Sequence, residues 1–235
     1  MTKTIHIVLL VAILAAGVRV GIIFYQRHEA SIVPEKKEAP PLNPDYYVSP
    51  KKLYPYDLKS AKQITKQPVW VKVGYAYPYY LYEPAAHRVN FSHEAGKLGP
   101  LQKLDVKDVV TGVSPKDPGE RQVLVVFNDG AKTYATPIGK ESDGEFKFFS
   151  DDMFFIENPH QLYKHWPANV WQAIDQHQAK PGMNELQVGC AIGIGLLESG
   201  SDEIDRTLDY PNGGKPLTIS FHDGKATDIK PGSAS

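Results

Sequence analysis

The sequence predicts an α+β protein that consists of an N-terminal transmembrane helix, a small antiparallel β-barrel, and two helices followed by three strands. Three observations support this prediction. A long apolar run opens the chain, short alternating stretches separated by turn residues begin at Val69, and two helical patterns precede three strand patterns after Asn158. The predicted boundaries are 1–25 for the transmembrane segment, 26–67 for a proline-rich linker, 68–157 for the barrel domain and 158–235 for the C-terminal domain.

The apolar run reads IHIVLLVAILAAGVRVGIIFY over residues 5–25, and only His6 and Arg19 interrupt it. As a helix from Ile7 it would be about 28 Å long, near the roughly 30 Å hydrocarbon thickness of a bilayer. We therefore expect residues 5–25 to bind the lipid bilayer as an uncleaved, single-pass signal anchor. The alternative is a cleaved signal peptide with its small-residue cleavage site at residues 15–17.

The anchor predicts a location in the cytoplasmic (inner) membrane of a bacterial cell envelope. Positive charges lie on both sides of the run, with Lys3 before it and Arg27, Lys36 and Lys37 after it, so the positive-inside rule leaves the orientation open. We favour a cytoplasmic N-terminus. The soluble part is then expected in the periplasm, or otherwise outside the cytoplasm.

Residues 26–67 predict a spacer, because they combine prolines and charges without a sustained apolar period. The spacer contains Tyr46, Tyr47, Tyr54 and Tyr56. These tyrosines favour contact of its later part with the folded domain.

The barrel is predicted from strand patterns that begin with VWVKVGYAYPYYLY at Val69. Five more candidates follow, at residues 87–91, 101–110, 121–129, 131–138 and 145–156. The pair Asp129-Gly130 predicts a type I′ hairpin turn. The sequence HEAGKLGPLQKLDVKDVV, in which glycines bound a segment that leads into alternating apolar residues, resembles the SH3-like barrels of bacterial envelope proteins, and this resemblance extends over about residues 68–157.

The C-terminal domain is predicted to begin with helices. In PANVWQAIDQHQ, Pro167 suits the first helical position, and Asn184 can cap a second helix, ELQVGCAIG. Strand patterns then follow at residues 206–211, 216–221 and 225–230, and short glycine-containing turns join them.

The segments GMNELQVGCAIG, LDYPNGG and LTISFHDGKATDI together resemble the SmpA/OmlA, or BamE-like, module of small bacterial envelope proteins, over about residues 170–230. The resemblance implies a two-helix, three-strand binding module. This chain departs from the family pattern at Gly193-Ile194-Gly195, where the family commonly has Gly-x-Pro. The chain's one cysteine, Cys190, lies inside the domain, so the lipid anchor of the family's barrel-assembly lipoproteins is not implied.

The glycines around Cys190 could indicate a catalytic or nucleotide-binding site. Their spacing does not support either interpretation. GIGLLESG has neither the dinucleotide-binding spacing nor a preceding strand, and GGKP is not a phosphate-binding loop. We expect Gly189, Ala191 and Gly193 to allow close packing, Gly193 or Gly195 to end the helix, and Cys190 to be a small buried hydrophobe. No catalytic or cofactor-binding residue and no cofactor is therefore predicted.

Metal binding has candidate residues but poor spacing. His160 and His165 would lie about 140° apart on a helix, and Asp175 and His177 are also poorly placed. The acidic stretch at residues 198–205 lacks the EF-hand pattern. No metal site is predicted, and a solvated loop is the ordinary explanation of the acidic stretch.

Charge and cysteine content narrow the possible partners. The net charge is −1 and no basic stripe is present, so we do not expect a nucleic-acid partner. A single cysteine excludes an intrachain disulfide framework. Stability is therefore expected to come from an ordinary apolar core.

Aromatic residues are the best candidates for contact with a partner, although most such residues fill cores. The candidates are Tyr75, Tyr77, Tyr79, Tyr80, Trp166 and Trp171. For the two tryptophans, a role in joining the barrel to the helical module is favoured. We expect a membrane-anchored, non-enzymatic envelope protein that binds a protein partner or stabilises a membrane complex; the alternative is an envelope hydrolase or glycan-binding accessory with its site between the two domains.

Overall fold

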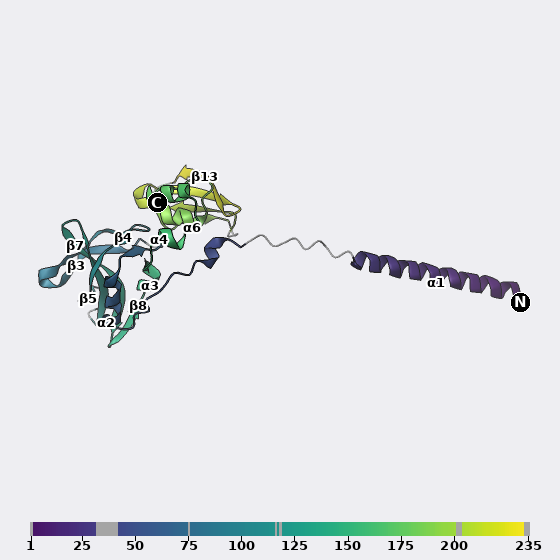
Figure 1. Ribbon diagram of the computed structural model, residues 1–235, viewed down its shortest axis with the longest axis horizontal. Coiled ribbons are helices and arrows are strands. Elements are labelled where there is room, and N and C mark those ends of the chain that lie inside the picture. The colour runs from purple at the N-terminus through teal and green to yellow at the C-terminus, as the bar shows by residue number, and fades with distance from the viewer. Residues whose placement is uncertain are drawn as a thin grey trace. The chain divides into compact units, whose positions relative to one another are not determined.

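The protein, described by a computed structural model, has a mixed α+β fold. The structure describes residues 2–31, 42–74, 76–115, 117, 119–200 and 204–232. Contacts divide the chain into two compact units, Met1–Asn43 and Pro44–Ser235. All strands belong to the second unit (Figure 1).

The first unit contains helix α1 (Thr2–Ser31), which covers the predicted membrane segment. Within the described part of the chain, however, no helix has both the length and the apolar character needed to cross a bilayer. Arg19 lies within the predicted segment, and a charge is costly in hydrocarbon. The predicted transmembrane signal anchor is therefore wrong, and so is the single-pass inner-membrane location that depended on it.

The larger sheet of the second unit has six antiparallel strands in the order β3-β2-β7-β6-β5, with β8 paired to β7. Its strands are β2 (Pro78–Glu83), β3 (Arg88–Lys97), β5 (Val106–Val113), β6 (Glu120–Asp129), β7 (Lys132–Ser142) and β8 (Glu145–Phe148). The predicted hairpin at Asp129-Gly130 forms between β6 and β7. Asp129 pairs with Lys132, so the two turn residues are Gly130 and Ala131. Only Gly130 has a positive φ, of 59°, and the predicted type I′ turn at Asp129-Gly130 is therefore wrong.

The predicted closed barrel is wrong. In the described residues, β3 and β5 are the two outer strands of an open sheet. The chain uses three further segments, β1 (Val69–Val71), β4 (Lys103–Leu104) and β9 (Phe154–Phe155), for a separate three-stranded sheet. Local alternation of apolar residues predicts strands but does not say which strands pair. We call residues 69–155, which hold both sheets, the sheet lobe.

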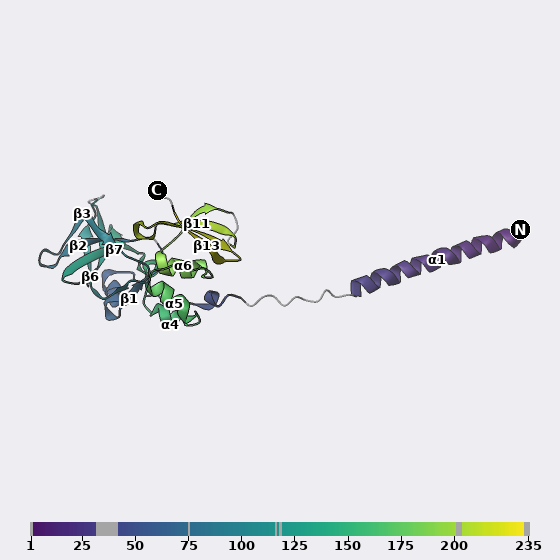
Figure 2. The same cartoon turned by 90° about the horizontal axis from the view of Figure 1, so that it is seen from above.

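We call residues 158–232 the C-terminal lobe. Its helices are α4 (Pro159–Leu162), α5 (Ala168–Asp175) and α6 (Glu185–Ile192), and its antiparallel sheet has the order β10-β11-β12-β13. These strands are β10 (Leu196–Ser199), β11 (Arg206–Tyr210), β12 (Leu217–His222) and β13 (Lys225–Pro231). Figure 2 shows α5 and α6 on one side of this sheet. The module predicted with three strands therefore has four, because β10 was not expected.

The N-terminus of α6 follows the sequence prediction. The side chain of Asn184 accepts a hydrogen bond from the Gln187 backbone N–H, and the Gln187 side chain accepts one from the Asn184 backbone N–H. This reciprocal capping box satisfies two backbone donors that the helix itself leaves unpaired. The predicted cap is confirmed.

Acidic side chains hold the later part of the predicted linker against the second unit. The carboxylate of Asp151 accepts hydrogen bonds from the backbone N–H groups of Leu53 (3.1 Å) and Tyr54 (2.8 Å), and Glu157 accepts one from Lys51 (2.9 Å). Tyr46, Tyr47, Tyr54 and Tyr56 are all exposed. Backbone contacts with carboxylates, and not the tyrosine rings, therefore keep this segment in place.

Short helices complete the second unit. They are η1 (Pro44–Tyr47), α2 (Leu58–Ala61), η2 (Lys62–Lys66), η3 (Pro84–Ala86), α3 (Ser150–Met153) and η4 (Asn212–Gly214). Two of them cover the sheet lobe, since Ala61 of α2 and Ile64 of η2 are buried in its apolar cluster with Val109.

Replacing Tyr210 by phenylalanine is expected to raise the free energy of unfolding by about 1 kcal/mol. The reason is that the Tyr210 hydroxyl is buried and has no hydrogen-bond partner among the described residues. Burial and the nearby Glu185 raise the pKa of this phenol. Urea unfolding measures the change, and Tyr47→Phe, which removes an exposed hydroxyl, is the control. A loss of stability would contradict the expectation.

Candidate functional site

The predicted partner-binding tyrosines pack within the sheet lobe. Tyr79 makes edge contacts with Phe127 (5.7 Å between ring centroids) and Tyr134 (5.0 Å). Tyr80 contacts Phe91 in the same manner at 5.1 Å. Tyr77 is half-buried against the apolar cluster of this lobe, and Tyr75 lies outside the described residues. The three described tyrosines therefore line no common site.

The predicted tryptophans lie in a ladder of neighbouring aromatic rings in the C-terminal lobe. His160 stacks on Trp171 with 3.8 Å between centroids, Trp171 lies 5.1 Å from Trp166, and Trp166 stacks on Tyr163 at 4.4 Å. Phe155 of the sheet lobe contacts the end of the ladder at Tyr163. The ring contact with the sheet lobe is therefore made by Tyr163, and a direct role of the two tryptophans in joining the lobes stays a prediction.

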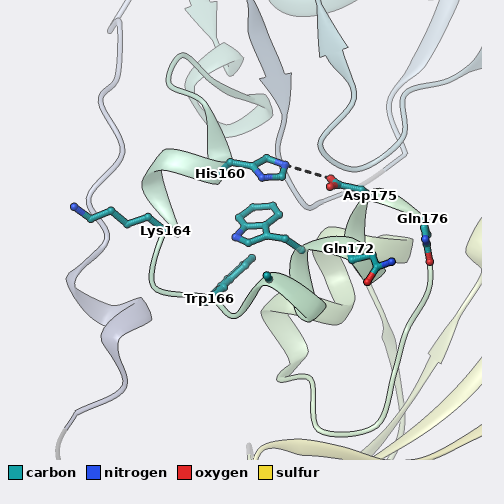
Figure 3. A pocket seen from close by; sticks show the side chains of 8 residues that line it. His160, Lys164, Trp166, Gln172, Asp175 and Gln176 are labelled. Atoms are coloured by element: carbon teal, nitrogen blue, oxygen red, sulfur yellow. Dashed lines mark hydrogen bonds and ion pairs between the residues drawn. The ribbon is translucent and has the colours of Figure 1, made fainter.

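An open depression of about 540 Å³ lies beside this ladder. His160 and Asp175 both line it, and His160 Nε2 lies 3.2 Å from Asp175 Oδ1 (Figure 3). Sugar binding needs an exposed aromatic face, but Trp166 and Trp171 are only 5% and 8% exposed, because the rings of the ladder cover one another. The depression therefore offers a glycan few stacking contacts.

Asp45 joins the start of the second unit to the C-terminal lobe. One carboxylate oxygen lies 2.6 Å from His165 Nε2 and accepts a hydrogen bond from Trp166 Nε1 at 2.6 Å, while the other accepts one from Asn184 Nδ2 at 2.8 Å. Burial acts to raise the pKa of Asp45, but these three partners outweigh it and hold the pKa below its ordinary value. Asp45 is a structural anchor that sequence reasoning missed, because its partners are more than a hundred residues away.

A mainly apolar cleft of about 620 Å³ lies between the two lobes, and we call it the interlobe cleft. One wall comes from the segment after β1 and the loop after β3, and the other from the end of α6 and the turn after β11. Its lining residues are Val71, Lys72, Gly74, Ala76, Lys97, Leu98, Gly99, Pro100, His177, Ala191, Ile192, Gly193, Ile194, Pro211, Asn212, Gly213 and Gly214. Such concave, mainly apolar sites between lobes are typical binding sites.

Small residues of α6 allow it to lie close to the sheet lobe. Gly189 lies so close to Val73 that a Cβ atom there would be 2.6 Å from Val73 Cγ1. Gly193 then ends the helix with a φ of 97°, which glycine adopts without a steric penalty. These positions confirm the predicted roles of close approach and helix termination. The close contact, however, is with the sheet lobe.

His177 places a polar group in this apolar cleft. Its Nδ1 lies 3.1 Å from the carbonyl oxygen of Ala191 and, since a carbonyl can only accept, Nδ1–H is the donor. Nε2 of the neutral ring is then left as an acceptor. On the opposite wall, Lys72 donates to the Asp151 carbonyl, and burial together with Lys52 lowers the pKa of Lys72.

The chain leads from the cleft lining directly into β10, one of the two outer strands of the C-terminal sheet. Ile194 lines the cleft, and the next apolar residues, Leu196 and Leu197, are about 60% exposed. In the described residues β10 pairs only with β11, so its other edge presents backbone donors and acceptors to solvent. Sequence reasoning missed this strand. The available signal was the pair of adjacent leucines, Leu196 and Leu197, directly after Gly195.

Cys190 is buried, and burial raises the pKa of its thiol far above the ordinary range, as an inert core cysteine requires. The histidines considered as metal ligands do not converge, since His160 pairs with Asp175 and His165 with Asp45. Among the described residues, one group could hold a metal ion, namely Asp205, His222 and Asp223. All three are exposed, and His222 is already within 2.8 Å of Asp205.

No family model matches the chain, and neither a curated protein nor a solved structure matches it. The resemblances to a BamE-like module and to an SH3-like barrel stay predictions from the sequence.

Proposed function

We propose that this protein is a non-catalytic module that binds another protein through the interlobe cleft. The observation that carries the proposal is the apolar cleft between the lobes together with the exposed apolar residues beside it, Ile194, Leu196 and Leu197. Soluble proteins rarely leave neighbouring large apolar side chains exposed unless a partner covers them. His177 would orient a bound segment through Nε2.

The cleft also lies where the alternative function, a hydrolase or glycan-binding accessory, would have its site. Its described lining, however, has lysines, a histidine and an asparagine but no carboxylate, hydroxyl or thiol side chain. A nucleophile with a base and an orienting group is the usual requirement for hydrolysis. Binding of a protein segment is therefore the better-supported proposal.

Site-specific photo-crosslinking tests the proposal. With p-benzoylphenylalanine at Lys97, an exposed residue of the cleft lining, irradiation of intact cells is expected to give a discrete protein adduct. The second change Ile194→Lys should reduce its yield at least tenfold by placing a charge in the apolar cleft. The matched control carries the crosslinker at Val113, an exposed apolar residue of β5 outside the cleft lining.

The binding proposal requires that the crosslink yield be higher at Lys97 than at Val113. An adduct of equal yield at Val113, or one that Ile194→Lys leaves unchanged, would overturn it. The absence of any adduct at Lys97 would do the same.

A further inference from the structure

We propose that β10 accepts an extended, basic segment of the partner protein as a fifth strand of the C-terminal sheet. This inference rests on the proposed binding function and names the kind of segment that is bound. It follows from three features of β10: an uncovered apolar face, a free edge and an acidic surrounding.

The helical layer leaves the end of the sheet at β10 uncovered. Leu197 pairs with Leu208, so both side chains lie on the same face of the sheet. Leu208 is 3% exposed because it belongs to the core beneath the helices, whereas Leu197 is 61% exposed. An apolar side chain of an added strand would lie beside Leu197 and continue this core outwards.

The other outer strands of the two larger sheets carry protecting residues. β13 has Lys225 and Lys230 and ends at Pro231, β3 begins with Arg88 and ends with Lys97, and β5 carries Lys107. Lysines and prolines on an edge are the usual means of preventing unwanted strand addition. β10, with the sequence LLES, has neither. Its backbone edge is therefore open to pairing, as in domains that bind peptides by strand addition.

Charge selects the occupant. The described residues within 196–205 include the acidic residues Glu198 and Asp205 and no basic residue, and Glu198 within β10 is exposed. A second copy of this chain would bring a like-charged edge against it, which is unfavourable. A segment with lysine or arginine beside its apolar residues is complementary.

The strand and the cleft form one site. Ile194 lines the cleft two residues before β10 begins, so a segment paired with β10 can extend past residue 195 and place an apolar residue in the cleft. Backbone hydrogen bonds with β10 would supply affinity. The cleft and the acidic residues would supply the sequence preference.

Selection of peptides provides the test. Random 12-residue peptides displayed on phage are panned against the full chain, and an enriched peptide is synthesised with a fluorescent label. We expect apolar residues at alternate positions with lysine or arginine between them. Affinity, measured by fluorescence polarisation, should fall at least tenfold in Leu197→Lys and severalfold in Glu198→Lys, and should weaken with added salt.

Two further measurements complete the test. The Val113→Lys variant, which changes a similarly exposed residue on β5, should bind the peptide as the unchanged chain does. Hydrogen exchange should show new protection of β10 backbone amides in the complex. Circular dichroism checks that each variant is folded.

The outcomes separate this inference from the proposed function. Peptide binding that Ile194→Lys abolishes, without protection of β10 or sensitivity to Leu197→Lys, would leave the cleft as a binding site and overturn strand addition. Enrichment of acidic or uncharged peptides would also overturn it, as would self-association of the chain that Leu197→Lys abolishes without peptide binding. Failure of both the peptide selection and the Lys97 crosslink would overturn both proposals.

Discussion

Replacing Asp45 by alanine is expected to lower the free energy of unfolding by about 3 kcal/mol. The Asp45 carboxylate is the acceptor for Trp166 Nε1 and Asn184 Nδ2 and also contacts His165, and its side chain is only 9% exposed. The substitution leaves the buried Trp166 donor and the half-buried Asn184 donor unpaired, and an unpaired buried group costs about 1–3 kcal/mol. Urea unfolding at neutral pH measures the loss.

Two control variants define the cause of that loss. Asp45→Asn keeps one acceptor oxygen and should cost less than the alanine substitution. Tyr46→Ser changes the adjacent, fully exposed residue and should have little effect. Equal stability of the Asp45→Ala and Tyr46→Ser variants would show that the carboxylate is not an anchor.

The stability difference between the unchanged chain and Asp45→Ala should depend on pH. The folded-state pKa of Asp45 is below its ordinary value of 3.8, so its carboxylate stabilises the fold above that value. The contribution is lost as pH falls through the lower folded-state pKa. The stability difference between the unchanged chain and Asp45→Ala is therefore expected to be full at pH 7 and to shrink below about pH 4. A difference that grows on acidification would contradict this assignment.

Replacing Gly189 by alanine is expected to destabilise the protein by up to about 2 kcal/mol, although alanine normally favours a helix over glycine by about 1 kcal/mol. The added Cβ would lie 2.6 Å from Val73 Cγ1. Valine has little rotamer freedom, and overpacking costs about 1–3 kcal/mol, so the steric effect exceeds the helix preference. Thermal and urea unfolding measure the sign.

A second substitution provides the decisive check on Gly189. Val73→Ala removes the obstructing methyl group and, in the Gly189→Ala background, should restore at least part of the lost stability. The control Gly99→Ala adds a Cβ at a glycine of the cleft lining, where no atom outside its chain neighbours lies within 4 Å of that Cβ, and should change stability little. Stabilisation by Gly189→Ala alone would show that α6 and the sheet lobe are not in close contact.

The sequence predicted local structure well where one short segment carries its own signal. Asn184 and Gln187 form a capping box because both partners lie within one helical turn. Gly193 ends α6 because glycine tolerates a positive φ there. Cys190 is buried because apolar residues flank it on the helix. Each of these features depends on neighbours close in the chain.

The sequence predicted the assembly of these elements less well. Alternating apolar residues marked strands between Val69 and Phe155, but a barrel was inferred where two open sheets form. An apolar run was read as a membrane anchor, whereas no described helix qualifies as a span. β10 was not predicted, and its last two residues, Glu198 and Ser199, were assigned to an acidic loop, because the four exposed residues of the strand have no alternating pattern.

By itself, the sequence determined the positions of most strands, the helix cap and the inert cysteine, since backbone preferences and burial patterns act over a few residues. Only the tertiary structure decided that Asp45 meets Asn184 and that Val73 meets Gly189. It also decided that the residues near 98 and 193 enclose one cleft. These contacts join segments about 95 or more residues apart, and no local preference encodes which distant surfaces will bury one another.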